Sequence, residues 1–408
     1  MSEPLHAAVA ITGISVLTPL GDNLDAFNAA LLGGQCSVEA SEGLAAAGVS
    51  RLRDFDASRY ANVRGMRVYA RGTQLEICAA KLALADAGLD AAQLDPLQLG
   101  LVTASTFTHL ETLLEYDRGL VSVGTQRTNP TLMPLALPST PGAATALSIG
   151  AKAFSITLSD GGASGLAALG LAVRLVAEGR AQVCVVAGAF TVCRELMLSA
   201  ARAGLLASAE RFAVLDSSAC GMAFGEAAAA LVFEPSARAA ARGRQSHGVV
   251  LGHASTFATD ASRLPGALAR ACRSALANAD TKPQQLALIA SGANGQPEHD
   301  RAHGLALLDA LGAAAERPSL TAIKANLGES FDPSALLQTI AALGALRARM
   351  APPIARLREP ALAGLRYATQ PTVLDAGHAL VTSTSQTGAC SALVLATTPA
   401  RSAMPGQG

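Results

Sequence analysis

Short apolar segments alternate with Ala- and Leu-rich segments along the chain, and this alternation limits the possible fold more than any other feature. The apolar segments have the length and side chains typical of strands, and the segments between them have the length of helices. Such alternation favours an α/β fold with layered sheets. The predicted strands are Ala8–Ile14, Leu99–Ala104, Ser155–Ser159, Val183–Ala187, Ala227–Phe233, Val249–Leu251, Leu286–Ala290, Leu380–Ser383 and Ala392–Ala396. The predicted helices are Leu24–Leu32, Arg71–Ala87, His109–Leu120, Ser164–Glu178, Pro265–Ala279, Ala302–Leu311 and Ala335–Met350.

The length of the chain predicts more than one packed unit. A chain of 408 residues is too long for one ordinary core and suits two domains. The polar, Arg-rich stretch Ser236–Gly248 is the best candidate for a boundary. We therefore expect an N-terminal half at 1–245, a C-terminal half of similar style at 246–398 and a flexible tail at 399–408.

The composition excludes several classes of protein. Because 31 Lys and Arg residues balance 31 Asp and Glu residues, nothing suggests a surface for nucleic acid or anionic lipid. The N-terminus lacks a signal-peptide pattern and no uncharged stretch reaches the ~18 residues that span a membrane, so we expect a cytoplasmic protein without membrane insertion. Seven scattered Cys residues without a CxxC pair favour reduced thiols over disulfides or a zinc site, and we expect no metal or cofactor.

The sharpest local pattern is Phe154–Gly165, which reads FSITLSDGGASG. A strand runs into Asp-Gly-Gly and a helix of small residues begins at once, which is the architecture of a nucleophile elbow. A helix N-terminus would favour a thiolate at the tip of the turn, but the residue there is Gly162. Taken alone, the segment is better explained as a plain turn in which glycine supplies permissive backbone angles.

Five segments together change that interpretation. In chain order they are Ile11–Gly21 (ITGISVLTPLG), Leu137–Gly150 (LPSTPGAATALSIG), Phe154–Gly188, Phe224–Glu234 (FGEAAAALVFE) and Ile323–Gly328 (IKANLG). They resemble, in the same order, segments of the β-ketoacyl carrier-protein synthases of the condensing-enzyme superfamily. The resemblance implies a thiolase-like fold, in which two similar α/β halves form a layered α-β-α-β-α core.

The resemblance also implies that the catalytic groups are missing. These synthases use a Cys thiolate that takes an acyl chain from a carrier protein, and two His that support decarboxylation of the malonyl extender. The Cys position falls on Gly162, and the first His position falls near Gly292. The second His position falls on Glu329, whose carboxylate would repel the malonyl carboxylate, while the family's Lys is retained as Lys324. We therefore expect a catalytically inactive chain.

Other motifs of the family have changed as well. The loop that gates the pocket in the family reads SQTGAC at Ser385–Cys390, and the RDGF stretch has become Ala219–Met222. Ser159 and Ser164 flank the elbow and are candidate substitutes for the nucleophile. A serine nucleophile needs a base within hydrogen-bond reach, and the expected His positions are empty.

Two pairs of polar residues carry further expectations. Lys324 and Glu329 flank a tight Asn-Leu-Gly turn, and we expect a buried ion pair that fills the former catalytic pocket; the alternative is a Glu329 that faces solvent. His299 and His303 lie at i and i+4, which is compatible with two ligands of a metal site. Without a third ligand, a pair satisfied by other groups or by solvent is the favoured interpretation.

Inactive members of this superfamily include the chain-length factors, which pair with an active ketosynthase as a heterodimer in type II polyketide systems. The resemblance implies an active ketosynthase subunit and an acyl carrier protein as partners, with Phe154–Ser159 at the interface between subunits. By resemblance, the side chains that end the acyl tunnel are Phe107, Thr112, Leu113, Tyr116 and Met133. Aromatic-polyketide factors usually carry Gln where Gly162 stands. The chain therefore resembles more closely the ketosynthase-like partners of aryl-polyene and other reducing type II systems.

Two other functions stay open at this point. One is an acyltransferase or decarboxylase that uses a nucleophile other than Cys. The other is a scaffold that binds carrier protein without shaping the product. A covalent acyl group on the chain would indicate the first, and a product length insensitive to the predicted tunnel residues would indicate the second.

Overall fold

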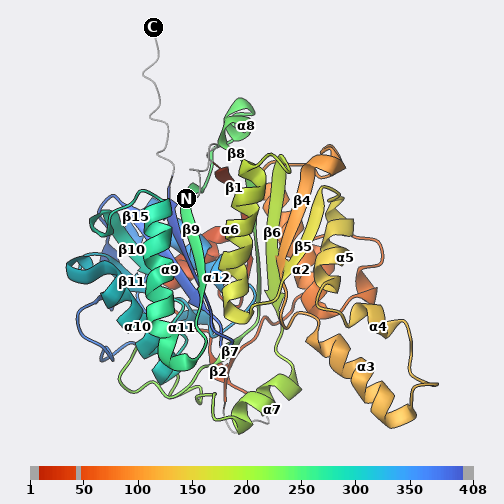
Figure 1. Cartoon of the computed structure of the whole chain (residues 1–408). Coiled ribbons are helices and arrows are strands. Elements are labelled where there is room, and N and C mark those ends of the chain that lie inside the picture. The colour runs from red at the N-terminus through yellow and green to blue at the C-terminus, as the bar shows by residue number, and fades with distance from the viewer. Residues whose placement is uncertain (1–8, 43–46, 398–408) are drawn as a thin grey trace.

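A sheet of eleven strands runs through the molecule (Figure 1). The computed structural model describes residues 9–42 and 47–397. One part of the sheet has the strand order β1 (Val9–Leu17), β8 (Ala227–Pro235), β6 (Val183–Phe190), β4 (Leu99–Ala104) and β5 (Phe154–Leu158). The other part has the order β9 (Gly248–Phe257), β16 (Ala389–Ala396), β15 (His378–Thr384), β10 (Leu286–Ala290), β11 (Ser319–Thr321) and β13 (Arg366–Tyr367).

The two parts of the sheet repeat one pairing pattern. In the first part, β1, β8 and β6 pair antiparallel, and β6, β4 and β5 pair parallel. In the second part, β9, β16 and β15 pair antiparallel, and β15, β10 and β11 pair parallel. The parts join where β1 pairs with β9. This repetition confirms the predicted two similar α/β halves; the boundary at residue 245 stays a prediction, and the tail at 399–408 lies outside the described residues.

Helices and sheet parts form five layers. The outer helices α2 (Arg71–Asp86) and α5 (Thr140–Ile149) pack on the first part of the sheet. Two helices, α6 (Ser164–Ala177) and α12 (Ser334–Ala348), lie between the parts and share one large apolar cluster with both. On the far side, α9 (Leu264–Asn278) packs on β9 and β16, and α10 (Pro297–Leu311) packs on α9. This is the predicted α-β-α-β-α core.

The middle layer requires small residues where α6 meets α12. A methyl group added at Gly165 would lie 2.9 Å from Cβ of Ala335 and 3.1 Å from the carbonyl oxygen of Asp332. Because interiors are close-packed, neither neighbour can move far to make room. The small residues that follow the elbow therefore let α6 approach α12.

The predicted elements are present with shifted ends. Helix α10 begins at Pro297, before the predicted start at Ala302. The prediction missed the first turn because that turn carries Glu298 and Asp300 and shows no apolar periodicity. Strand β9 continues to Phe257 with partly exposed residues that did not read as an apolar run. Helix α7 (Arg194–Arg202) was not predicted, nor was α8 (Ser236–Ala241), which lies inside the stretch assigned to the boundary.

Strand β5 forms one edge of the sheet, and an arm extends beyond it (Figure 1). The arm consists of α3 (Leu110–Val123) and α4 (Leu132–Leu135). Exposed apolar side chains lie on the arm and on the following residues; they are Leu113, Val121, Val123, Met133, Leu137 and Leu147. A strand edge beside exposed apolar side chains is typical of a surface that pairs with another chain.

The remaining helices are short or lie near the sheet ends: α1 (Leu24–Leu32) and α11 (Lys324–Leu327). No helix in the described part of the chain is long and apolar enough to cross a membrane.

Candidate functional site

The elbow lies where β5 ends and α6 begins. Residues Gly161–Ala163 form one 3-10 turn, and α6 starts at Ser164. Gly161 has the positive φ of 58° that favours glycine, whereas Gly162 is outside that region. The explanation by permissive backbone angles therefore applies to Gly161 and not to Gly162.

Space, rather than backbone conformation, restricts Gly162. A Cβ atom there would lie 2.8 Å from the carbonyl oxygen of Thr384, at the end of β15. Ser383 on the same strand donates a hydrogen bond of 3.0 Å to the Gly162 carbonyl oxygen. The obstacle is a backbone atom held in a sheet, so it cannot easily move aside. Strand β15 therefore leaves little room for a side chain at the tip of the elbow.

Ser164, one of the two candidate substitutes beside the elbow, has no imidazole among its hydrogen-bond partners in the described part of the chain. Its Oγ accepts from the Asp160 amide at 2.7 Å and lies 3.4 Å from Oγ1 of Thr106. Ser164 is the first residue of α6, and these contacts hold it against the turn that precedes the helix.

The space expected for the first catalytic His is occupied from another element. Gly292 follows β10, and a Cβ atom there would lie 2.7 Å from the Thr382 carbonyl oxygen and 3.0 Å from Cε1 of His303. His303 comes from α10 and is fully buried. Burial, together with the charges of His299 and Lys324, lowers the pKa of His303 well below 6.5, so its ring is neutral.

The two histidines of α10 converge on one hydroxyl. Their ring centroids lie 4.7 Å apart, and their Nε2 atoms hydrogen bond with Oγ1 of Thr384, at 2.7 Å from His299 and 3.0 Å from His303. The described residues include no group of three or more His, Cys, Asp or Glu side chains suited to a metal ion. The Nε2 atoms of both rings have a partner, but Nδ1 of His299 is buried without a hydrogen-bond partner among the described residues, so the pair is only partly satisfied.

The predicted ion pair is present where the second catalytic His was expected. Lys324 Nζ lies 2.7 Å from Oε2 of Glu329, and both side chains are almost fully buried. Asn294 also donates to Oε2, at 3.1 Å, while Ser334 Oγ and the Phe331 amide donate to Oε1, both at 2.9 Å. Burial alone would raise the pKa of Glu329, but the charge and hydrogen bond of Lys324 lower it to about 2. Glu329 is therefore a fixed anion that faces into the protein.

A second buried carboxylate lies three residues further along the chain. Asp332 accepts from the Thr106 amide at 2.8 Å and from the Phe107 amide at 3.0 Å. Thr106 Oγ1 in turn accepts from the Gly161 amide at 3.0 Å. Asp332 thus ties the loop after β4 to the elbow, and burial raises its pKa to about 6 despite these hydrogen bonds.

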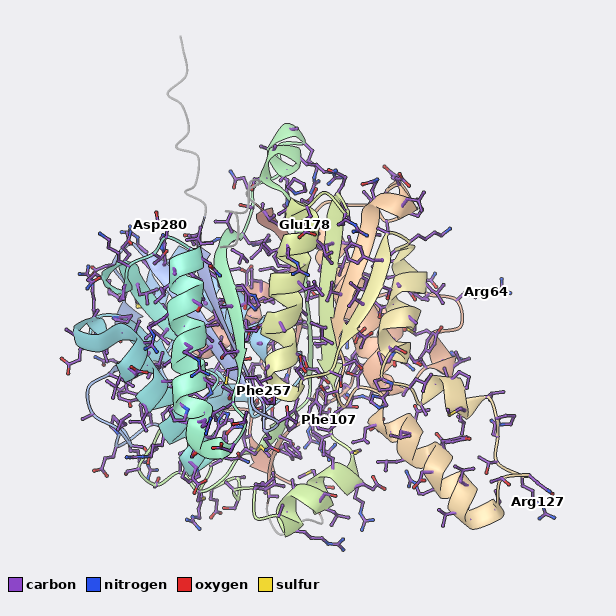
Figure 2. The ribbon with its side chains drawn as sticks, viewed as in Figure 1. Arg64, Phe107, Arg127, Glu178, Phe257 and Asp280 are labelled. Carbon is purple, nitrogen blue, oxygen red and sulfur yellow. The ribbon has the colours of Figure 1, made fainter. Side chains whose placement is uncertain are left out.

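The five predicted tunnel residues divide into an inner and an outer group. Thr112 is buried and Phe107 is partly buried, and Figure 2 shows Phe107 at the end of the sheet from which the arm extends. Leu113 is 38% and Met133 is 47% exposed on the arm, and Tyr116 is partly buried. These differences in exposure do not by themselves assign the side chains to a tunnel, so their role there stays a prediction.

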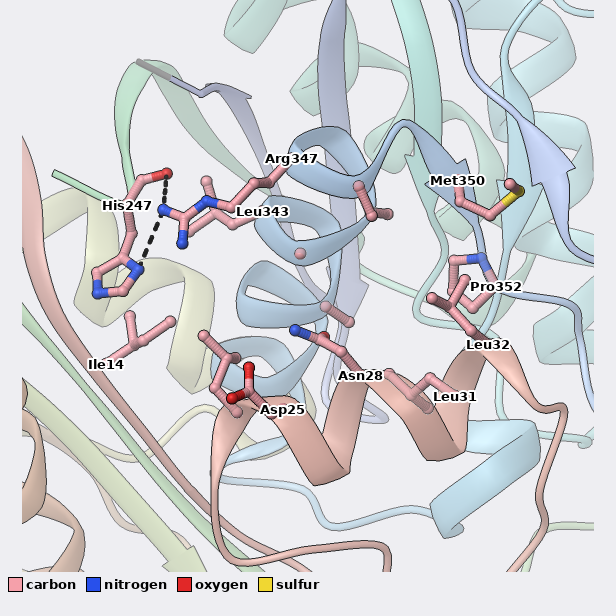
Figure 3. A pocket seen from close by; sticks show the side chains of 15 residues that line it. Ile14, Asp25, Asn28, Leu31, Leu32, His247, Leu343, Arg347, Met350 and Pro352 are labelled. Atoms are coloured by element: carbon pink, nitrogen blue, oxygen red, sulfur yellow. Dashed lines mark hydrogen bonds between the residues drawn. The ribbon is translucent and has the colours of Figure 1, made fainter. Parts of the chain in front are cut away.

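A separate pocket of about 180 Å³ lies between α1 and the second half of α12 (Figure 3). Asp25 and Asn28 line it from α1, and Arg347, which donates to the ring and the carbonyl of His247, lines it from α12. Arg347 lies thirteen helical positions beyond Ser334, or about 20 Å along α12. None of the predicted site residues lines this pocket.

Comparison with known proteins follows the same division into halves. The model of the β-ketoacyl synthase N-terminal domain matches residues 6–239, and that of the C-terminal domain matches residues 247–358. The chain belongs to the β-ketoacyl synthase family. The correspondence of Gly162, Gly292 and Glu329 to the catalytic positions of the family stays a prediction.

Relatives of this ketosynthase homologue include polyketide ketoacyl synthases and a 3-oxoacyl-[acyl-carrier-protein] synthase 2 of Synechocystis. A putative polyketide β-ketoacyl synthase 2 of Streptomyces halstedii is 32% identical over 86% of this chain and 88% of its own length. The tetracenomycin polyketide synthase ketoacyl synthase β subunit of Streptomyces glaucescens is 29% identical over 97% of this chain and 99% of its own. Among solved structures, the ishigamide ketosynthase/chain length factor superposes with a TM-score of 0.87 at 24% identity, covering 96% of this chain and all of that one.

Several residues of the site were missed by the sequence analysis. Thr384, Phe331 and Asp332 stand in no motif that marks them, and their partners lie far away in the chain. The His299 and His303 pair was noticed through its helical spacing, but the spacing does not name Thr384 as the common partner. The sequence signal for this packing is the glycine at position 292, because a residue without a side chain leaves room for another group.

Proposed function

We propose that this ketosynthase homologue is a catalytically inactive chain-length factor, which pairs with an active β-ketoacyl synthase and shapes the acyl tunnel of a type II polyketide system. The elbow carries the proposal: Gly162 offers no sulfur or oxygen to an acyl group, and the Thr384 carbonyl fills the space of its side chain. The anionic Glu329 supports it, since a carboxylate there opposes the binding of a malonyl carboxylate.

The surface of the chain supports a heterodimer. Strand β5 leaves one edge of the sheet open, the arm beside it exposes Val121 to 82%, and α5 exposes Leu147 to 80%. Apolar side chains in such a position are stabilised when a second subunit covers them. The partner that fits is an active ketosynthase of the same fold, and an acyl carrier protein would deliver the acyl group to that partner. Glycine at the elbow favours the aryl-polyene-type, reducing systems over aromatic ones.

Labelling separates the roles of the two subunits. The chain, an active type II ketosynthase and acyl carrier protein charged with a labelled acyl group are mixed, and each polypeptide is examined by intact-protein mass spectrometry. We expect the acyl mass on the ketosynthase alone, and a heterodimer in size-exclusion chromatography. Substitution of Leu113 or Tyr116 by Ala is expected to change the product length. An acyl mass on this chain contradicts the proposal, and an unchanged product length indicates a scaffold.

One observation favours a second candidate, an acyltransferase or decarboxylase with a different nucleophile. Thr384 Oγ1 is 2.7 Å from Nε2 of His299, which is the distance between a nucleophile and its base. Thr384 is nearly fully buried, at 4% exposure, and this is the reason for ranking it second. In the same labelling experiment this candidate requires an acyl mass that maps to Thr384 and is lost on Thr384→Val.

A further inference from the structure

Phe331 has a backbone conformation that is rare for its residue type. Its φ is +49°, in the left-handed region that bulky side chains seldom adopt. Such a conformation is energetically unfavourable and persists only where the surroundings impose it. The neighbours of Phe331 in the chain, Glu329 and Asp332, are the two buried carboxylates of the site.

These carboxylates hold Phe331 on both sides. The Phe331 amide donates to Oε1 of Glu329 at 2.9 Å. On the other side, Asp332 accepts from the amides of Thr106 and Phe107 at 2.8 and 3.0 Å. Hydrogen bonds to buried charged groups are stronger than those between neutral groups, so they can offset the strained backbone.

The ring of Phe331 lies at the centre of an aromatic cluster. Its centroid is 4.9 Å from Phe107, 5.2 Å from Phe190 and 5.6 Å from Phe224, all in edge-to-face geometry. Phe190 and Phe224 are buried, whereas Phe107 and Phe331 are partly exposed. The open side of the cluster is therefore made by Phe107 and Phe331.

The cluster stands next to the elbow. Thr106, which precedes Phe107, accepts from the Gly161 amide at 3.0 Å. An acyl chain that approached the former nucleophile from the side of the arm would meet the two partly exposed rings. Edge-to-face contacts stabilise a pair of rings beyond the contribution of the apolar area that the rings bury, so displacing the rings is unfavourable.

We propose that Phe331, together with Phe107, is an aromatic plug that keeps acyl chains out of this subunit, and that Glu329 is a positioning residue that holds the plug in place. The inference rests on the proposed function in one respect, since it assigns the growing chain to the partner. It explains why the second catalytic His position carries an acid with a fixed charge: the carboxylate holds a backbone instead of taking part in decarboxylation.

The test uses the full chain alone with cis-parinaric acid, a fluorescent long-chain fatty acid. Phe331→Gly and Phe331→Ala both remove the ring, and Gly also relieves the strain at positive φ. Phe331→Tyr keeps the ring and is the matched control, and Phe55→Ala removes a ring from the separate Phe55–Tyr60 stack. We expect both ring-removing variants to bind the fatty acid at least about tenfold more tightly than wild type, and both controls to match wild type.

Three results would overturn the plug. The first is wild-type protein that already binds the fatty acid as tightly as Phe331→Ala. The second is folded Phe331→Ala and Phe331→Gly, checked by thermal melting, that gain no affinity. The third is a similar gain in Phe55→Ala. If one variant does not fold, Phe107→Ala opens the same side of the cluster and takes its place. Because no partner is present, a failure here leaves heterodimer formation intact, and a failure to pair with a ketosynthase leaves this binding result intact.

Glu329 is tested as a positioning residue through the same binding measurement. Glu329→Gln keeps the shape of the side chain but removes the charge that holds the Phe331 amide. We expect fatty-acid affinity between that of wild type and Phe331→Ala. Affinity equal to wild type in a folded Glu329→Gln chain would show that the carboxylate does not hold the plug.

Discussion

Two buried glutamates, one in each half of the molecule, have opposite environments. Glu329 in the second half lies 2.7 Å from Lys324 Nζ, and its pKa is lowered to about 2 even though burial acts the other way. Glu76 on α2, in the first half, accepts only from Thr145 Oγ1, at 3.1 Å, and its Oε2 atom is without a partner in the described structure. Burial, and to a lesser extent Asp332, raises the pKa of Glu76 to about 8.

The turns that lead into the two middle helices, α6 and α12, also differ in the side chains that they carry. After β5, the tip of the turn at Gly162 has no side chain, whereas after β11 the chain carries the Lys324–Glu329 pair into α12. The turn in the first half has no side chain at its tip, and the turn in the second half carries a buried ion pair. The groups that fill the emptied site, Thr384 and His303, also come from the second half. At Gly162 and at Gly292, packing from the second half leaves no simple vacancy for an added side chain.

The largest expected effect comes from breaking the ion pair of the second half. Lys324→Met leaves Glu329 buried without its counter-charge, and we expect a loss of about 3–5 kcal/mol in the free energy of unfolding. Urea denaturation measures it. Lys152→Met, at an exposed lysine, is the matched control and is expected to change stability by less than about 0.5 kcal/mol. Equal small effects in both variants would remove the contrast between the halves.

A smaller effect is expected at the elbow of the first half. Gly162→Ala places a methyl group 2.8 Å from the Thr384 carbonyl oxygen, and we expect a loss of about 1–3 kcal/mol. Gly266→Ala on α9 meets only the end of Arg270, at 3.8 Å, and is expected to be neutral or stabilising. The same denaturation experiment compares them. A Gly162→Ala chain as stable as Gly266→Ala would mean that the elbow is open, and Gly162→Cys would then be a realistic route to a restored nucleophile.

The last prediction concerns pH and the unpaired glutamate. The folded pKa of Glu76, about 8, lies above its ordinary 4.5, so the folded chain holds a proton that the unfolded chain releases between these values. Stability is therefore lost as pH rises from about 4.5 to about 8, by up to about 1.4 kcal/mol per pH unit. We expect Glu76→Gln to remove this contribution, so that its stability relative to wild type rises across the window. Parallel curves for wild type and variant between pH 5 and pH 8 would contradict it.

Local patterns made the element order predictable, and the resemblance to the ketosynthase family implied the two similar halves and the buried Lys324–Glu329 pair. A helix or strand shows itself in the spacing of its apolar residues, and Lys324 and Glu329 are close enough in sequence for a tight turn to bring them together. Thr384 and His303 are 81 residues apart, and Thr106 and Asp332 are 226 apart. No spacing rule connects residues at such separations, so these contacts were not predicted.

What the sequence by itself determined is the absence of a nucleophile at Gly162, because a glycine carries no reactive atom in any fold. It also determined the alternation that builds the layered core, because burial follows the period of apolar residues. Only the tertiary structure decided what occupies the emptied site. That depends on the backbone of β15, which meets Gly162, and on the His303 ring of α10, which meets Gly292. Packing between such distant segments is decided by the assembled layers and not by any one segment.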